Sequence, residues 1–136
     1  MADVFDTEKR SEVMSRIRGR GNKTTELAMM KLFREHGLTG WRRHQKLPGK
    51  PDFVFRSGKV AVFVDGCFWH GCPRCYREPR TRKRFWRDKI NGNKKRDGKV
   101  ARTLRSRGWK VARVWECSLR KQPQSTVRRI ARMLGR

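Results

Sequence analysis

The feature that most constrains this chain is the placement of its four cysteines. Cys67, Cys72 and Cys75 lie close together, and Cys117 comes much later in the sequence. A Cys-x-x-Cys spacing is a common half-site for zinc, which structural sites hold with four ligands at tetrahedral angles. The pattern predicts a structural zinc ion on all four cysteines, with two disulfides as the alternative. Such an ion would fasten the loop at 67–75 to a distant segment and leave no position open for water.

The charge of the chain limits its partners. Lysine and arginine number 37 against 12 acidic residues, which gives a net charge of +25 spread from Lys9 to Arg136. A small domain with this charge repels itself unless it binds a polyanion, and nucleic acid is the expected polyanion. An anionic membrane surface is the alternative, but the chain lacks a basic amphipathic helix with a broad apolar face.

Length and hydropathy indicate the compartment and the domain organisation. The start of the chain lacks the apolar run of a signal peptide, and no stretch has the length of a transmembrane helix. We therefore expect a cytoplasmic, nucleoid-associated protein, where reduced thiols favour metal ligation over disulfides. Residues 1–23 are polar and predict a basic arm that orders on its nucleic-acid partner. Residues 24–136 then form a single domain.

Apolar periodicity predicts alternating helices and strands. Thr24 or Thr25 is expected to cap a helix that stops at Gly37. Two β-rich runs joined by residues 56–59 predict an antiparallel hairpin. The following elements are a long basic helix over residues 81–107 that Gly92 and Gly98 weaken, a strand over 109–116, and a helix over 126–134. The expected fold class is α/β, with a small mixed β-sheet flanked by helices.

Two aspartates stand at the ends of the predicted hairpin. Asp52 opens the first strand and Asp65 ends the second, so an antiparallel hairpin returns them to the same neighbourhood. Converging carboxylates in so basic a chain predict a Mg²⁺ site that can hold a phosphate. His70 follows on the cysteine-rich loop, where a neutral imidazole can take a proton from attacking water. For each acid, an ordinary salt bridge with arginine is the alternative.

Five sequence blocks together resemble a known enzyme family. In order, they are RSEVMSRIRGRGNKTTE, LPGKPDFVF, VAVFVDGCFWHGC, FWRDKINGNKKRD and GWKVARVWEC. They are similar to the very-short-patch-repair (Vsr) DNA mismatch endonucleases from about Thr7 to Leu119. The resemblance implies a restriction-endonuclease-like fold and Mg²⁺-dependent nicking of one strand 5′ of the thymine in a T:G mismatch. Such mismatches arise from deaminated 5-methylcytosine, so a cytosine-5 DNA methyltransferase and mismatch-repair proteins are expected functional associates of a monomeric enzyme.

The resemblance also implies roles for individual residues. Asp52 resembles the central metal-binding aspartate, with the main-chain carbonyl of Val64 beside it. His70 resembles the histidine that activates water, and Glu26 and Asp97 resemble the supporting acids. The four cysteines fall on the family's structural zinc site.

The resemblance also covers one position where this chain differs from the family and the residues expected to contact DNA. Where the best-known version of the family has histidine, this chain has Asp65, which is predicted to supply an extra metal ligand. The residues expected to touch DNA are Phe68, Trp69 and Trp86, which enter from the major-groove side, Met14 and Ile17 in the arm near the minor groove, and Asn93.

The loop that carries Phe68 and Trp69 favours a wedge over a core position, because adjacent residues cannot both point inward. A T:G wobble pair is easier to unstack than a matched pair, so inserted aromatics are expected to favour mismatches.

Two alternative functions stay open. One is a homing or restriction-type nuclease that cuts matched DNA, and the other is a zinc-stabilised nucleic-acid-binding module without activity.

Overall fold

The computed structural model describes residues 25–136 of the chain. The predicted arm, with Met14 and Ile17, lies outside the described residues. The predicted first helix covers residues 25–35 of the described part. The elements that follow are β1 (Trp41–Arg43), β2 (Phe53–Phe55), β3 (Val60–Asp65), α2 (Lys83–Ser106), β4 (Lys110–Trp115), α3 (Glu116–Lys121) and α4 (Pro123–Met133).

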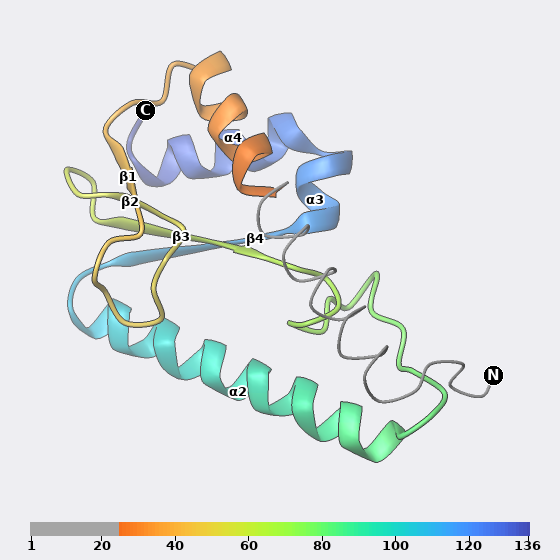
Figure 1. Cartoon of the computed structure of the whole chain (residues 1–136). Helices are drawn as coiled ribbons and strands as arrows, with labels where there is room; N and C mark the ends of the chain where they lie inside the picture. The colour runs from red at the N-terminus through yellow and green to blue at the C-terminus, as the bar shows by residue number, and fades with distance from the viewer. Residues whose placement is uncertain (1–24) are drawn as a thin grey trace.

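A four-stranded mixed sheet forms the middle layer of the fold, in the order β1-β2-β3-β4. The pairs β1–β2 and β2–β3 are antiparallel, and β3–β4 is parallel. Parallel neighbours need a long crossover connection, and the cysteine-rich loop with α2 provides it here. Helix α2 covers one face of the sheet, and the helix over 25–35, α3 and α4 cover the other (Figure 1). The mixed α/β architecture predicted from the sequence is confirmed.

Alternation along β3 divides its side chains between two cores. Val60, Val62 and Val64 belong to the larger core, which also contains buried side chains of the helix over 25–35 and of α4. Ala61 and Phe63 belong to the smaller core with Leu104 of α2. Because successive strand residues point to opposite faces, Asp65 continues the row of Ala61 and Phe63. The last residue of β3 is therefore an acid directed to the α2 side of the sheet.

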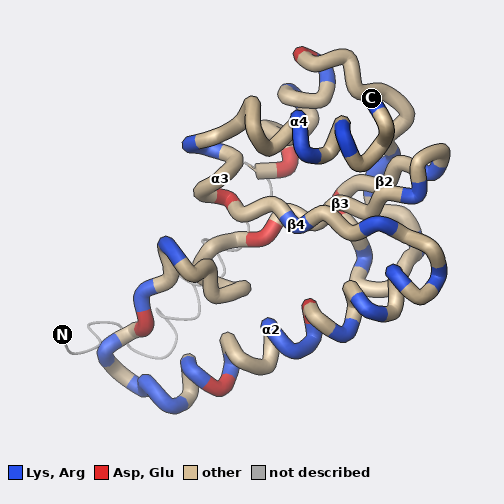
Figure 2. Tube along the Cα trace, turned by 180° about the vertical axis from the view of Figure 1, so that it is seen from behind, with Lys and Arg blue, Asp and Glu red and all other residues tan. Residues whose placement is uncertain are grey.

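Helix α2 is longer than the sheet that it covers, and its outer surface is basic. Its buried residues are Trp86, Ile90, Ala101 and Leu104. Lysine and arginine recur along much of its remaining length (Figure 2). Gly92 and Gly98 lie inside one continuous helix, so neither breaks it. In the described part of the chain, no helix combines the length and the apolar character needed to span a bilayer.

Three elements differ from the sequence-based prediction. Strand β1, which pairs with β2, was not predicted. It is only three residues long, and alternation over three residues is too short to predict a strand. The strand expected over 109–116 stops at Trp115, and Cys117 lies in helix α3. Helix α4 begins at Pro123 and not at residue 126. Proline is favoured in the first turn of a helix, where the backbone N–H that it lacks would have no partner within the helix.

Candidate active site

The loop after β3 gathers the cysteines. The N–H of Cys72 donates to the carbonyl of Cys67 at 2.9 Å, and α3 brings Cys117 to the same place. The four Sγ atoms, including that of Cys75, lie within 4.8 Å of one another, and those of Cys72 and Cys117 are 3.7 Å apart. A zinc–sulfur bond of about 2.3 Å implies a sulfur–sulfur distance of about 3.8 Å at tetrahedral angles. The cluster therefore has the dimensions of a zinc site, and all four cysteines are free thiols.

The surroundings favour the thiolate form of Cys72, whereas burial raises the pKa of Cys67 to about 12. Burial opposes ionisation of Cys72, but backbone N–H groups of Arg74 and Cys75 help to lower its pKa to about 7. A guanidinium nitrogen of Arg74 lies 3.6 Å from Sγ of Cys117 and donates to Oγ of Ser118 at 2.7 Å. Metal ions bind sulfur in its deprotonated form. Four cysteine sulfurs are a ligand set that fits a zinc ion.

Gly71 allows the same loop to lie directly on α2. Its φ of +65° lies in the left-handed region, and a Cβ here would meet side-chain carbons of Ile90 and Lys94 at 2.6 and 2.5 Å. Next to it, Nδ2 of Asn93 donates to the main-chain carbonyl of Trp69 at 2.8 Å. His70 stands between these two attachment points, so its backbone is fixed against α2.

His70 is held by an acid of α2. Its Nδ1 lies 2.6 Å from Oδ2 of Asp97, and its Nε2 lies 3.8 Å from Oδ1 of Asp65. If Nδ1 carries the proton and donates it to Asp97, Nε2 keeps a lone pair that can accept a proton. The ligand atoms of Asp65, His70 and Asp97 all lie within 4.8 Å of one another. The structure thus brings together three predicted site residues from β3, the loop and α2.

Arg113 of β4 completes this group, and the sequence-based reasoning missed it. Its Nη1 lies 3.1 Å from both carboxylate oxygens of Asp65, and its Nη2 donates to the main-chain carbonyl of Asp97 at 3.3 Å. Burial raises the pKa of Asp65, while the charges of His70 and Arg113 act in the opposite direction. The one available signal was the alternation of β4, which puts Arg113 on the same face as Val111. Without the register between β3 and β4, this alternation does not show which residue Arg113 contacts.

Asp52 lies beside Val64, one strand away. Its Oδ2 accepts a hydrogen bond from the N–H of Val64 at 2.7 Å. The pKa of Asp52 is raised to about 7, mainly by burial and also by the neighbouring acids Glu26 and Asp65, while the hydrogen bond from Val64 acts in the opposite direction. A buried carboxylate surrounded by other acids is stabilised in its charged form by a divalent cation.

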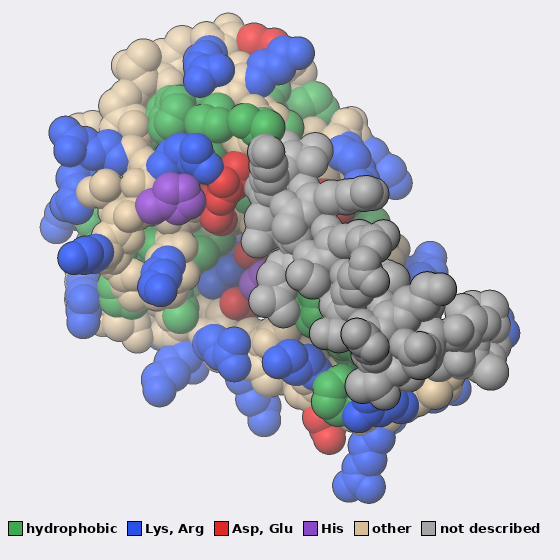
Figure 3. All heavy atoms as spheres, viewed as in Figure 1, with side chains coloured by type: hydrophobic (Ala, Val, Ile, Leu, Met, Phe, Trp, Pro, Cys, Tyr) green, Lys and Arg blue, Asp and Glu red, His purple; other side chains and the backbone are tan. Residues whose placement is uncertain are grey.

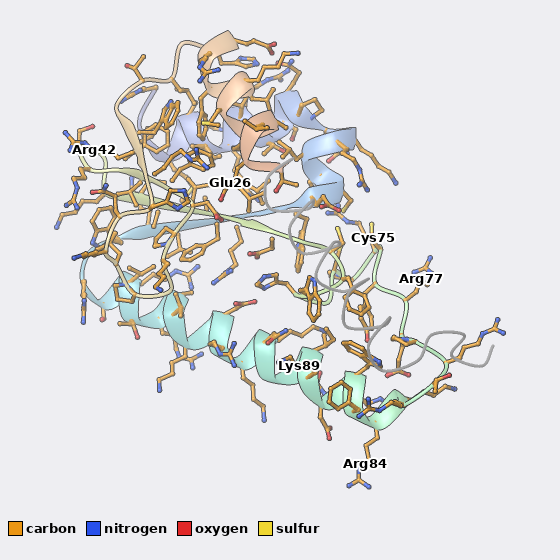
Figure 4. The ribbon with its side chains drawn as sticks, viewed as in Figure 1. Glu26, Arg42, Cys75, Arg77, Arg84 and Lys89 are labelled. Atoms are coloured by element: carbon orange, nitrogen blue, oxygen red, sulfur yellow. The ribbon has the colours of Figure 1, made fainter. Side chains whose placement is uncertain are left out.

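Glu26 approaches the same site from the other layer. It lies near the start of the described helix over 25–35 (Figure 4) and forms an ion pair with Arg43 of β1. Its effect on the pKa of Asp52 shows that the two carboxyl groups are neighbours. Arg43 therefore compensates one acid of the pair and leaves Asp52 as the acid available to a cation.

The raised pKa of Asp52 leads to a prediction about stability. Asp52→Asn is expected to stabilise the Mg²⁺-free protein by about 2 kcal/mol at pH 8, with a gain that shrinks as the pH falls toward 4. A folded-state pKa near 7, above the unfolded value, means that stability from this group is present at low pH and is lost as the pH rises through 7. Urea unfolding across this range measures the gain, with exposed Asp88→Asn as the control. A gain that does not depend on pH would contradict the assignment.

Aromatic side chains form a cluster next to His70. The rings of Phe68 and Trp69 are 5.2 Å apart, and they lie 5.4 and 6.1 Å from the ring of Trp86. Phe68 and Trp69 are partly exposed, whereas Trp86 is buried beneath them. Tyr76 extends the cluster on one side, and Phe85, which is 45% exposed, extends it on the other. The sequence-based reasoning gave Phe85 only as an apolar position of the long helix and did not include it among the aromatic side chains expected to touch DNA.

The face drawn in Figure 3 combines these features. Acidic and histidine side chains lie in its middle, and lysine and arginine lie around them. A basic surround attracts a polyanion, while the acids in the middle provide ligands for a cation. The predicted DNA contacts of Asn93 and Trp86, and the metal-binding role of the Val64 carbonyl, stay predictions.

Comparison with known proteins connects this site to one family. The family model described as DNA mismatch endonuclease Vsr matches residues 2–77. The type II nicking enzyme V.XorIIP of Xanthomonas oryzae pv. oryzae is 40% identical over 122 residues, which cover 88% of each chain. The DNA mismatch endonuclease Vsr of Escherichia coli is 39% identical over 128 residues, covering 93% of this chain and 81% of that one.

A further relative gives the same result. The type II nicking enzyme V.NmeAIP of Neisseria meningitidis is 38% identical over 122 residues, which cover 88% of this chain and 86% of that one. The family model covers more than half of the chain, and the similarity to each of these relatives extends over most of both sequences. The chain belongs to the Vsr family and is a DNA nicking endonuclease.

Proposed function

We propose that this enzyme uses Mg²⁺ to nick one strand of duplex DNA 5′ of the thymine in a T:G mismatch. The main support is the placement of Asp52, His70 and the aromatic cluster at one end of the sheet, where a cation, a base and a wedge would lie within reach of one site. Such mismatches are the product of 5-methylcytosine deamination. A cytosine-5 DNA methyltransferase and mismatch-repair proteins would then be its functional associates.

Asp52 would hold the Mg²⁺, together with the main-chain carbonyl of Val64. Mg²⁺ prefers oxygen ligands, and Asp52 is a buried carboxylate next to Glu26 that forms no ion pair with a lysine or arginine of residues 25–136. When bound, the ion supplies positive charge that stabilises the phosphate group during attack. Asp52 itself fixes the position of that charge relative to β3 and the His70 loop.

His70 would act as the general base. Asp97 accepts the Nδ1 proton and fixes the ring, so Nε2 can take a proton from a water molecule placed for attack on the phosphate. The contact of Gly71 with α2 and the bond from Asn93 to the Trp69 carbonyl hold the loop that carries the ring. The base is therefore positioned by α2 and not by the DNA.

Phe68 and Trp69 would form the wedge. Their rings lie on Trp86, whose burial gives them a rigid support. Inserting rings into a duplex costs a few kcal/mol of unstacking, and base–aromatic stacking returns about 1–3 kcal/mol for each base. The cost is smaller at a wobble pair, so the balance favours T:G.

Trp69→Ala is expected to reduce the preference for T:G over T:A by about 10- to 100-fold, the value of one lost stacking contact. The reason is that the ring contributes to the complex with the mismatch more than to the hydrolytic step. Parallel nicking assays on the two duplexes measure the ratio. Trp109→Phe, beyond the other end of α2, is the control. An unchanged ratio in Trp69→Ala would remove Trp69 from the wedge.

The four-cysteine cluster would hold a structural Zn²⁺. With Cys67, Cys72, Cys75 and Cys117 as ligands, the ion would join the His70 loop to α3 and would have no open position for water. The ion would therefore stabilise the loop and take no direct part in hydrolysis.

Cys72→Ser is expected to lower the zinc content below one ion per chain and to lower the Tm by at least about 10 °C. The physical reason is that zinc binding contributes roughly 10 kcal/mol to the folding of small zinc domains. Metal release to a colorimetric chelator and thermal unfolding measure the two effects. Ser118→Ala, next to Cys117, is the control. Full zinc occupancy with an unchanged Tm in Cys72→Ser would exclude the zinc site.

A second candidate is strand-specific nicking of matched DNA, because several relatives are named type II nicking enzymes. Strand-resolved cleavage of T:G, A:C and fully matched duplexes, with and without Mg²⁺, separates the two candidates. We expect one nick, 5′ of the thymine, in the T:G duplex with Mg²⁺ only. Equal rates on matched duplexes would favour the second candidate, and cleavage without Mg²⁺ would contradict the metal assignment.

A further inference from the structure

We propose that Asp65 and Arg113 form an ion-pair strut that positions His70 and Asp97, and that Asp65 is not a ligand of the catalytic metal. The sequence alone predicted an extra metal ligand at Asp65, whereas the contacts of its carboxylate favour this different role. The proposal rests on the proposed function of His70 as general base. Both Asp65 and Arg113 are positioning residues, since they act through His70 and Asp97.

The first step concerns the burial of Asp65. Its side chain is only 4% exposed, and both its oxygens lie 3.1 Å from Nη1 of Arg113. A buried carboxylate is strongly disfavoured unless a positive charge compensates it. Arg113 supplies that charge within the protein, so Asp65 needs no metal ion for this purpose.

The second step concerns what else Arg113 touches. Its Nη2 donates to the main-chain carbonyl of Asp97 at 3.3 Å, and its Nη1 lies 3.7 Å from Oδ1 of the same residue. Its guanidinium group lies 4.3 Å from the centre of the Phe63 ring. A planar fork with several donors can bind two groups at once, which a lysine cannot do in the same way. Arg113 therefore connects β3, β4 and α2 next to Asp97, the residue of α2 whose side chain contacts His70.

The third step compares Asp65 with Asp52. Among residues 25–136, no lysine or arginine forms an ion pair with Asp52, whereas Asp65 has one on both oxygens. A divalent cation between Nε2 of His70 and Oδ1 of Asp65 would lie close to the guanidinium group and would be repelled. The two aspartates thus have different chemistry: Asp52 is available to a cation and Asp65 is already compensated.

A double-mutant cycle on the full-length, zinc-loaded protein tests the proposal. The proteins are wild type, Asp65→Asn, Arg113→Gln and the double variant, with exposed Arg102→Gln as the control for loss of one positive charge. Each is assayed on a T:G duplex at saturating enzyme for the single-turnover nicking rate. Duplex affinity and the Mg²⁺ concentration for half-maximal rate are measured separately.

The strut predicts non-additive losses of rate. Each single variant should slow nicking by about 30-fold, because it leaves an unpaired charge beside His70, and the double variant by about 10-fold instead of the product of the two. Half-saturation by Mg²⁺ should stay within about twofold of wild type, and Arg102→Gln should keep the wild-type rate. Multiplicative losses, or a half-saturation that rises about tenfold in Asp65→Asn whichever residue is at 113, would overturn the proposal.

Folding and the role of His70 are checked separately. Where Arg113→Gln does not fold, Asp65→Asn alone decides: slower nicking at unchanged Mg²⁺ half-saturation supports the strut, and a wild-type rate or a raised half-saturation overturns it. The Nδ1–H proton resonance of His70 gives a readout without nicking. It should be lost in Arg113→Gln and retained in Arg102→Gln, and its persistence in Arg113→Gln would overturn the proposal. By contrast, a wild-type rate in His70→Ala would refute the proposed base and leave this spectroscopic result standing.

Discussion

Asp52→Ala is expected to abolish nicking, with a rate at least about 10³-fold below wild type, while duplex binding is retained or improved. The carboxylate is the proposed anchor of Mg²⁺, and without the ion the charge that develops on the phosphate during attack has no stabilising partner. Loss of a negative charge near the DNA backbone removes a repulsion, so affinity should not fall. Single-turnover nicking of a T:G duplex and a direct binding assay measure the two effects.

The matched control for this variant is Asp88→Ala, which removes an exposed acid of α2 and should leave the nicking rate unchanged. The Asn variant at position 52 adds a second check, since it should be inactive and yet more stable than wild type at pH 8. Nicking by Asp52→Ala at the wild-type rate in Mg²⁺ would show that the metal is held elsewhere.

His70→Ala is expected to lower the nicking rate by about 10²- to 10⁴-fold, the usual contribution of a positioned general base. The affinity for T:G should change little, because Phe68 and Trp69 and not the imidazole enter the duplex in the proposed mechanism. The loss should be partly relieved at high pH, where hydroxide replaces a base-activated water. Single-turnover rates between about pH 6 and 9 test both statements.

The chain offers a matched control in His36, which is exposed at the end of the helix over 25–35. His36→Ala should leave both rate and affinity unchanged. Asp97→Asn tests the orientation of the ring, and its loss should not multiply with that of His70→Ala, because Asp97 acts only through the imidazole. Independent losses in the double variant would separate Asp97 from the base.

The raised pKa of Asp52 also makes the proposed metal site sensitive to pH. Below a pH of about 7, a proton would compete with Mg²⁺ for this carboxylate. Acid conditions are therefore expected to weaken Mg²⁺ binding at the proposed site. Arg43 limits the effect by compensating Glu26, the nearest other acid.

Local features of the sequence determined much of this protein. The cysteine spacing predicted the four-thiol cluster, since three of its members are neighbours along the chain and only Cys117 is distant. The β-rich runs on either side of residues 56–59 predicted the hairpin, and with it the approach of Asp52 to β3. Helix α2 followed from its apolar positions. Apart from Cys117, the partners in these cases are close in sequence, so local pattern is sufficient to predict them.

Only the tertiary structure decided which residues of the site contact one another. The crossover through α2 sets a parallel register between β3 and β4, which places Arg113 beside Phe63 and within reach of Asp65. The sequence showed an arginine in a strand and could not show its partner, because 37 lysines and arginines offered equally plausible pairs. The burial of Trp86 beneath Phe68 and Trp69 likewise depends on the close contact of the loop with α2. Contacts between segments far apart along the chain are fixed by packing and register, and those are properties of the folded molecule.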